Sequence, residues 1–174
     1  MMATKKSMMV LFGILVISAW VLGSVIHAGA ETMKCRSAST STKDERIPVS
    51  DAEGHVLGLQ IAEGLAFFDN GEIAKTRAHT IYDTMPGIGS QTIVYNIYTF
   101  EDGSTIVLRN QRMLVTDQSG KVSAKVTGEI IKGTGRFEGI KGTISATGKN
   151  FPPSKGEAMR ATTDSIFTYT LPTK

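Results

Sequence analysis

The stretch GTGRFEGIKGTISATGK, residues 133–149, has five glycines among alternating small, apolar and charged residues. Such a density of glycine lets the backbone either approach a phosphate closely or bend sharply within a β-sheet. A Walker A loop has four residues between its glycines, whereas Gly142 and Gly148 enclose five, and neither Ser nor Thr follows Lys149. A dinucleotide-binding loop would need a third glycine where Glu138 stands. The stretch therefore predicts bends and bulges in a curling sheet.

Segments on both sides of this stretch alternate apolar and polar residues with the period of two that is typical of β-strands. Asn70-Gly71 and Asp102-Gly103 predict tight hairpin turns, because these residues accept positive φ. No segment has a convincing helical period. We expect seven or eight strands at hairpin spacing, and hence an all-β antiparallel eight-stranded barrel, with a sandwich as the alternative. The predicted strands cover about residues 55–68, 72–83, 91–101, 104–116, 121–131, 140–147 and 159–171.

The first 30 residues resemble a secretory signal. Lys5 and Lys6 precede a long uncharged apolar run that ends at Ala28-Gly29-Ala30. We expect cleavage after Ala30 and a secreted or periplasmic protein; left uncleaved, the apolar run is long enough to anchor the chain in a membrane. Residues 31–54, which are rich in Ser, Thr, Lys and Asp, predict a flexible leader, so that residues 55–174 form the barrel domain.

Composition argues against several classes of partner. Without Lys5 and Lys6 the formal charge falls from +3 to about +1, and no basic patch remains to indicate nucleic-acid binding. Cys35 is the only cysteine, so it is either an idle thiol in the leader or pairs with a second chain. Only His55 and His79 lie beyond the signal, and no zinc spacing or calcium loop is present. No metal and no cofactor are predicted.

Four segments resemble, in the same order, segments of the allene oxide cyclase and dirigent family of β-barrels. They are GLAFFDNGEIA, YNIYTFEDGSTIV, GTGRFEGIKGTI and IFTYTL, and the resemblance extends from about His55 to Leu171. It implies a secreted member of bacterial type with a calycin-like barrel, frequently trimeric, and an apolar cavity. Members of the family handle hydrophobic small molecules without a cofactor, and direct a cyclisation or a radical coupling by shape.

The resemblance reaches the cyclase water site only in part. In the family an Asn of a Phe-x-Asn segment helps to hold a water on the substrate epoxide, and Phe68-Asp69-Asn70 matches that segment. The upstream Glu-x-Asn and Ser-Pro elements have no counterpart before His55. Asn70 is therefore a candidate ligand-binding residue, with a structural role in the hairpin turn before Gly71 as the alternative.

Glu63 is the candidate catalytic residue. It continues, at period two, a row of apolar residues, and if this row faces the lumen then burial would disfavour the charge of the carboxylate. Glu63 would then act as an acid or stabilise a developing positive charge. The alternative is an ion pair with Arg77 or Arg109 at the barrel mouth. The row contains Leu57, Leu59, Ile61, Leu65 and Phe67.

Three further side chains are candidates for binding a ligand. Tyr82 and Tyr98 each offer a flat apolar face with one hydroxyl, with core packing as the alternative. Tyr95 and Tyr98 are an odd number of residues apart, so at most one of them lines the lumen. Arg109 shares a mixed row with Gln111 and either faces a ligand or lies on the surface.

Some predicted strands are apolar on both faces, and apolar residues outside a small barrel need a partner. Ile93, Val94, Ile97 and Leu108 therefore indicate a homo-oligomer, a trimer or a dimer. The leading hypothesis is an exported barrel that binds a small hydrophobic molecule in its lumen. The alternatives are a cofactor-independent isomerase or cyclase, and an oligomeric barrel whose core is filled.

Overall fold

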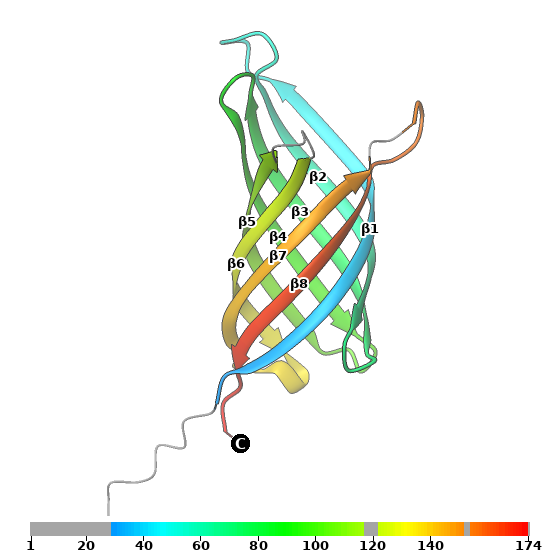
Figure 1. Ribbon diagram of the computed structural model, residues 1–174, viewed down its shortest axis with the longest axis vertical. Helices are drawn as coiled ribbons and strands as arrows, with labels where there is room; N and C mark the ends of the chain where they lie inside the picture. Colours follow the sequence, from blue (N-terminus) through cyan, green and yellow to red (C-terminus); the bar gives the residue numbers. More distant parts are fainter. Residues whose placement is uncertain (1–28, 117–121, 152–153, 174) are drawn as a thin grey trace, which may run out of the picture.

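Eight β-strands form a closed barrel, as the computed structural model shows for residues 29–116, 122–151 and 154–173 (Figure 1). The predicted fold class is confirmed. A single turn of 3-10 helix, η1 (Gly135–Phe137), follows the sixth strand. The strands are β1 (Glu31–Pro48), β2 (Val56–Phe68), β3 (Ile73–Met85), β4 (Gly89–Phe100), β5 (Thr105–Thr116), β6 (Val122–Thr134), β7 (Lys141–Phe151) and β8 (Arg160–Thr170).

Each strand is antiparallel to the strands before and after it, and β1 closes the ring. One edge of β1 pairs with β2 from Cys35 to Pro48, and its other edge pairs with β8 from Glu31 to Thr40. Every strand therefore has a neighbour on both sides, so the ladders satisfy backbone groups that an open sheet would leave at its edges.

The prediction of a flexible leader over residues 31–54 is wrong, because Glu31–Pro48 forms β1, the longest strand of the barrel. Small hydroxyl side chains fit a narrow lumen, and hydrogen bonds to two neighbouring strands hold this segment with little apolar burial. Only the residues after Pro48 form a loop, which leads to β2. The inward row of β1 is Met33, Cys35, Ser37, Ser39 and Ser41.

Cys35 lies in the barrel core and not in a mobile segment. Burial raises the pKa of its thiol to about 11, so the reactive thiolate is scarce at neutral pH. Cys35 is therefore an idle thiol, as one of the two predicted alternatives states, but it lies in the barrel core and not in a leader; the other alternative, a bond to a second chain, lacks the accessibility that it needs.

The large apolar residues of β2 face outward. Leu65 and Phe67 are 42% and 47% exposed, whereas Ala66 and Phe68 between and beside them are buried. The inward row is made mostly of small residues because the lumen of an eight-stranded barrel is narrow. At Gly58, for example, a Cβ atom would collide with the ring of Tyr82.

One half of the lumen is a packed core. Phe68 lies 5.1 Å from Phe100 and 6.2 Å from Phe167, measured between ring centroids, and Tyr98 meets Phe167 edge-on at 5.5 Å. Ile106, Leu108 and Phe167 are fully buried. The same core cluster includes Phe137 of η1, whose ring centroid lies 4.9 Å from that of Phe100. The 3-10 turn η1 covers this end of the barrel (Figure 1).

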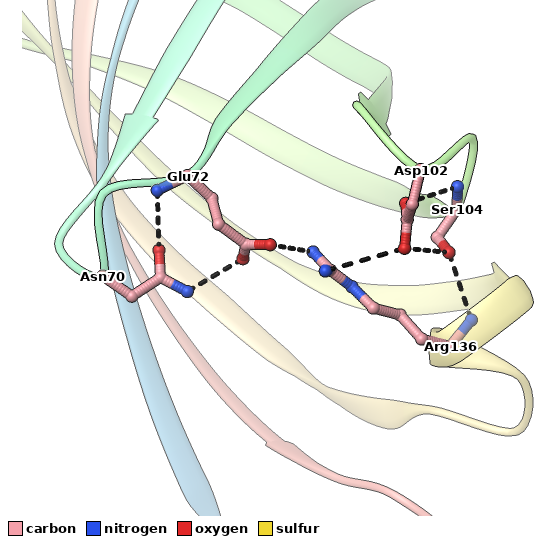
Figure 2. A network of polar contacts seen from close by, with 5 residues as sticks. All are labelled: Asn70, Glu72, Asp102, Ser104 and Arg136. Atoms are coloured by element: carbon pink, nitrogen blue, oxygen red, sulfur yellow. Dashed lines mark hydrogen bonds and ion pairs between the residues drawn. The ribbon is translucent and has the colours of Figure 1, made fainter.

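A network of polar contacts ties η1 to two hairpins at this closed end (Figure 2). Arg136 pairs with Glu72 at 2.5 Å and with Asp102 at 3.6 Å, and its guanidinium lies 4.8 Å from the ring centroids of both Phe100 and Phe137. Gly135 and Gly139 have φ values of +62° and +76°, which only glycine adopts readily. The glycine-rich stretch thus makes the sharp turn that covers the core.

The predicted signal, residues 1–30, lies outside the described residues apart from Gly29 and Ala30. Residues 117–120, between the predicted strands over residues 104–116 and 121–131, also lie outside them. In the described part of the chain, no helix has the length and apolar character needed to span a membrane.

Candidate functional site

The other half of the lumen contains a cavity of about 110 Å³. Its floor is formed by Tyr98 and Ile144 at the top of the packed core, and it extends toward Asn150 and Met159 near the opposite rim. Short side chains surround it, because β-strands place every second residue inward and the inward residues here are small. They include Ser37, Ser39, Ser41, Ala62, Thr76, Ala78, Thr80, Ala124, Ala146, Gly148, Ala161, Thr163 and Ser165.

The cavity has an apolar wall and a polar wall. On β6 and β7, Val126 lies opposite Ala146 and Ala124 lies opposite Gly148 in the ladder, so this wall carries no polar side chain at these positions. Inward hydroxyl and amide groups from β1, β3, β4 and β5 form the other wall. A molecule with an apolar body and a polar end would match both walls.

Arg112 is the only charged side chain among the described residues that line the cavity. It lies on β5, opposite Thr92 of β4 and Val126 of β6. Its Nε atom is buried and has no hydrogen-bond partner within the described residues. Burial lowers the pKa of the guanidinium, and no carboxylate among them offsets that effect.

Asn110 lies two residues before Arg112 on the same inward face of β5. Its Nδ2 donates a hydrogen bond to Oδ1 of Asn96 at 3.2 Å, but its own Oδ1 is buried and lacks a donor. The two buried side-chain atoms without partners in the described chain, Asn110 Oδ1 and Arg112 Nε, thus belong to residues that line the same cavity. Buried polar atoms are normally hydrogen-bonded, so each such exception needs an explanation.

Arg109, the basic residue that the sequence analysis singled out, lies on the outer face of β5. Its nearest partner is Glu129 at 3.9 Å, and its side chain is 46% exposed. Of the two positions predicted for Arg109, facing a ligand or lying on the surface, the structure shows the second. Arg112 is three residues further on, and this odd separation places the two side chains on opposite faces. The inward row that continues from Ile106 and Leu108 is the signal that could have identified it.

Glu63 also lies outside the barrel, so the expectation of a carboxylate in the lumen is wrong. It pairs with Arg77 at 3.6 Å, and both side chains are about half exposed. The ion pair proposed as the alternative is the observed arrangement. The physical reason is that the row of bulky side chains on β2 faces outward, while its row of small side chains faces the lumen.

Asn70 lies at the closed end, away from the cavity. Its Oδ1 accepts a hydrogen bond from the backbone N–H of Glu72 at 3.1 Å, and its Nδ2 donates to the Glu72 carboxylate at 2.8 Å (Figure 2). These bonds form an Asx turn, which is the structural role given as the alternative for this residue.

Tyr82 and Tyr98 both point into the lumen, whereas Tyr95 lies on the outer face of β4. Tyr98 is buried in the packed core, and burial raises the pKa of its hydroxyl far above the usual value. Tyr82 lies near the rim, where its hydroxyl donates to Asp44 Oδ1 at 2.7 Å. The five predicted site residues are therefore spread over the rim, the core, the closed end and the outer surface.

The Asp44 carboxylate at the rim is a feature that sequence reasoning missed, because it falls in the predicted leader. Burial opposes its charge, but hydrogen bonds from Tyr82 and Arg46 hold the pKa of Asp44 below its usual value. Burial and the bond to Asp44 raise the pKa of Tyr82. At neutral pH the rim therefore holds an ionised carboxylate and a neutral phenol.

His55 fastens the loop between β1 and β2 at the same rim. Its Nδ1 contacts Asp51 Oδ1 at 2.5 Å and its Nε2 contacts Asp83 Oδ1 at 2.9 Å. Hydrogen bonds to Asp51 and Asp83 raise the pKa of His55, since the imidazolium can donate to both carboxylates. Within the described residues, no group of three or more His, Cys, Asp or Glu side chains is arranged to hold a metal ion.

Comparison with known proteins bears on the fold. The pterocarpan synthase dirigent protein GePTS1 matches this barrel with a TM-score of 0.51 and 12% sequence identity, over 83% of this chain and 88% of that chain. The fold is dirigent-like. The pterocarpan synthase dirigent protein PsPTS1 gives a TM-score of 0.48 at 13% identity, over 83% of this chain and 97% of that chain. No protein-family model and no curated protein matches the sequence. The match to GePTS1 thus supports the dirigent-like fold that the resemblance implied.

Proposed function

We propose that this barrel binds a small, mainly hydrophobic molecule in the polar-walled half of its lumen. The observation that carries the proposal is the cavity of about 110 Å³ above a fully packed core. An apolar cavity of about 150 Å³ accommodates benzene, whereas sites for drug-sized ligands measure about 300–1,000 Å³. The ligand therefore inserts a part no larger than an aromatic ring, and anything bulkier extends past the rim.

Titration with toluene, followed by NMR, tests this proposal. Toluene should shift signals of Ala78 and Val126, which line the cavity. Ala146→Leu fills the cavity and should abolish these shifts, while Thr147→Leu adds a similar side chain to the exposed outer face of the same strand and should leave them unchanged. Circular dichroism confirms that both variants are folded. Binding in the lumen would be contradicted if both variants still bound toluene, or if both lost binding to the same extent.

A second candidate function is that of a cofactor-independent isomerase or cyclase. The dirigent-like fold supports it, as does the ionised Asp44 beside the neutral Tyr82, because a carboxylate at the rim could stabilise positive charge developing on a bound molecule. Molecules that co-purify with the protein should be identified by mass spectrometry and incubated with it. Formation of an isomer of the same mass, lost in Asp44→Asn, supports catalysis, whereas binding without conversion supports a carrier.

Export is part of the proposal. β1 begins at Glu31, so cleavage after Ala30 leaves the whole barrel intact, and Tyr169 still bonds to the Glu31 carboxylate at 2.9 Å. N-terminal sequencing of protein from the medium or periplasm should start at Glu31. A full-length chain recovered from membranes would instead favour an uncleaved anchor.

We also propose a homo-oligomer that covers apolar side chains of the outer wall. Ile73 and Ile81 on β3 are 51% and 54% exposed. On β2, Ile73 lies opposite Phe67, which is 47% exposed, and Ile81 lies opposite Leu59. Of the residues predicted for such a face, Ile93 and Ile97 point outward, whereas Val94 and Leu108 are buried in the lumen. Light scattering should give a dimer or a trimer, and Ile81→Lys should convert it to a monomer.

A further inference from the structure

The two partnerless polar atoms in the cavity specify the ligand more closely. Arg112 Nε needs a hydrogen-bond acceptor and Asn110 Oδ1 needs a donor, and both belong to residues on the inward face of β5. Residues two apart on a strand are separated by about 7 Å. A ligand that satisfies both atoms therefore carries an acceptor at one end and a donor several ångströms away.

The charge of Arg112 favours an anionic acceptor. Arg112 is partly buried, and partial burial of a cation without a counter-charge is costly. None of the described residues that line the cavity is acidic. The carboxylate at the rim, Asp44, is already bonded by Arg46 at 2.8 Å and by Tyr82. The acceptor that compensates Arg112 must then come from the ligand.

A carboxylate fits this environment better than a phosphate. One cation balances one negative charge, while a phosphate dianion would leave a second charge in a wall of hydroxyl and alkyl groups. A carboxylate also matches the planar guanidinium. Val126 pairs with Arg112 in the ladder and Ala146 pairs with Val126, so an apolar surface adjoins the cationic group.

From this geometry, and resting on the proposed lumen binding, we infer that the ligand is an organic monocarboxylate with a hydroxyl or other donor on its apolar body. The carboxylate binds Arg112 and the donor binds Asn110. Asn110 follows Ile106 and Leu108 of the packed core on the inward face of β5, and Arg112 lies two residues further toward the rim, so the ligand enters with its donor leading and its carboxylate nearer the rim.

Two probes of equal shape test the inference: 4-hydroxybenzoate, which carries the charge, and 4-hydroxybenzamide, which does not. NMR titrations of the purified protein should give at least roughly tenfold tighter binding of the carboxylate, as hydrogen bonds to charged groups are stronger than neutral ones. The Arg112 Nε–Hε signal should move with the carboxylate. Benzoate, which lacks the donor, should bind more weakly than 4-hydroxybenzoate.

Arg112→Gln should remove the preference for the carboxylate, and Arg112→Lys should retain part of it. Arg109→Gln is the matched control, since it removes a guanidinium from the outer face of the same strand. Equal binding of acid and amide, or a loss in Arg109→Gln as large as in Arg112→Gln, would overturn the inference. If toluene still binds and Ala146→Leu still abolishes it, the proposed function survives that outcome. If neither toluene nor either probe binds, both the proposed binding in the lumen and the inference about the carboxylate are contradicted.

Discussion

The two halves of the barrel lumen are built by the same eight strands but differ in what fills them. At the closed end, aromatic rings pack centroid to centroid at 4.9–6.2 Å beneath η1. At the other end, the inward positions carry Ser, Thr, Ala, Gly and Asn around a cavity, and Arg112 Nε has no hydrogen-bond partner among the described residues. The first half supplies stability and the second leaves room for a ligand. This separation lets the protein tolerate the partly buried charge of Arg112, because the packed half already stabilises the fold.

The largest effect should come from the packed half. Phe167 is fully buried, and Phe167→Ala should lower the free energy of unfolding by about 3–5 kcal/mol in denaturant titrations. Ile166→Ala, on the next position of β8 but 44% exposed, should cost less than about 1 kcal/mol. Similar losses in the two variants would mean that this half is not the stabilising one.

In the polar half of the lumen, replacing one side chain should raise the free energy of unfolding instead of lowering it. Arg112→Met replaces a guanidinium whose Nε has no partner among the described residues with an apolar side chain, and should raise the free energy of unfolding by about 1–2 kcal/mol without ligand. The difference in stability between Arg112→Met and the wild type should disappear when 4-hydroxybenzoate is present, since only the wild type binds this ligand through the charge of Arg112. A destabilised variant would indicate that Arg112 has a structural partner.

The polar network over the closed end should contribute less than the core beneath it. Arg136→Met breaks the ion pairs with Glu72 and Asp102 and the contacts with two rings, at a cost of about 1 kcal/mol for this half-exposed side chain. The effect should shrink in high salt, which screens the ion pairs. Lys141→Met on the exposed start of β7 serves as the control, for which no ion pair is seen among the described residues.

The smallest effect should be a pH dependence at the rim. The pKa of His55 is raised above 6.5 in the folded state, mainly by hydrogen bonds to Asp51 and Asp83. Its stabilisation is therefore fully present below that value and is lost as pH rises through the higher folded pKa. Thermal melts should show the melting temperature falling over this range, and His55→Gln should flatten the curve. An unchanged curve would show that protonated His55 does not hold the loop.

Much of the fold could be predicted from sequence, whereas the site could not. Hairpin signals such as Asn70-Gly71 and the alternation along each strand predicted an antiparallel barrel, and Tyr95 and Tyr98 lie on opposite faces as that alternation requires. The catalytic role predicted for Glu63 depended on its apolar row facing the lumen, and that condition fails because bulky residues cannot fit inside. Arg112 continues the row of Ile106 and Leu108 in the sequence, but no local feature of the sequence indicates that this row faces inward.

The sequence by itself determined the period of two, the positions of the turns and the glycines that allow the chain to bend, because these depend on local backbone sterics. Only the tertiary structure decided which face of each strand became the lumen and that the Ser-rich segment from Glu31 completes the ring. Alternation is symmetric between the two faces of a strand. The choice between them depends on how much volume all eight inward rows share, which no single strand encodes.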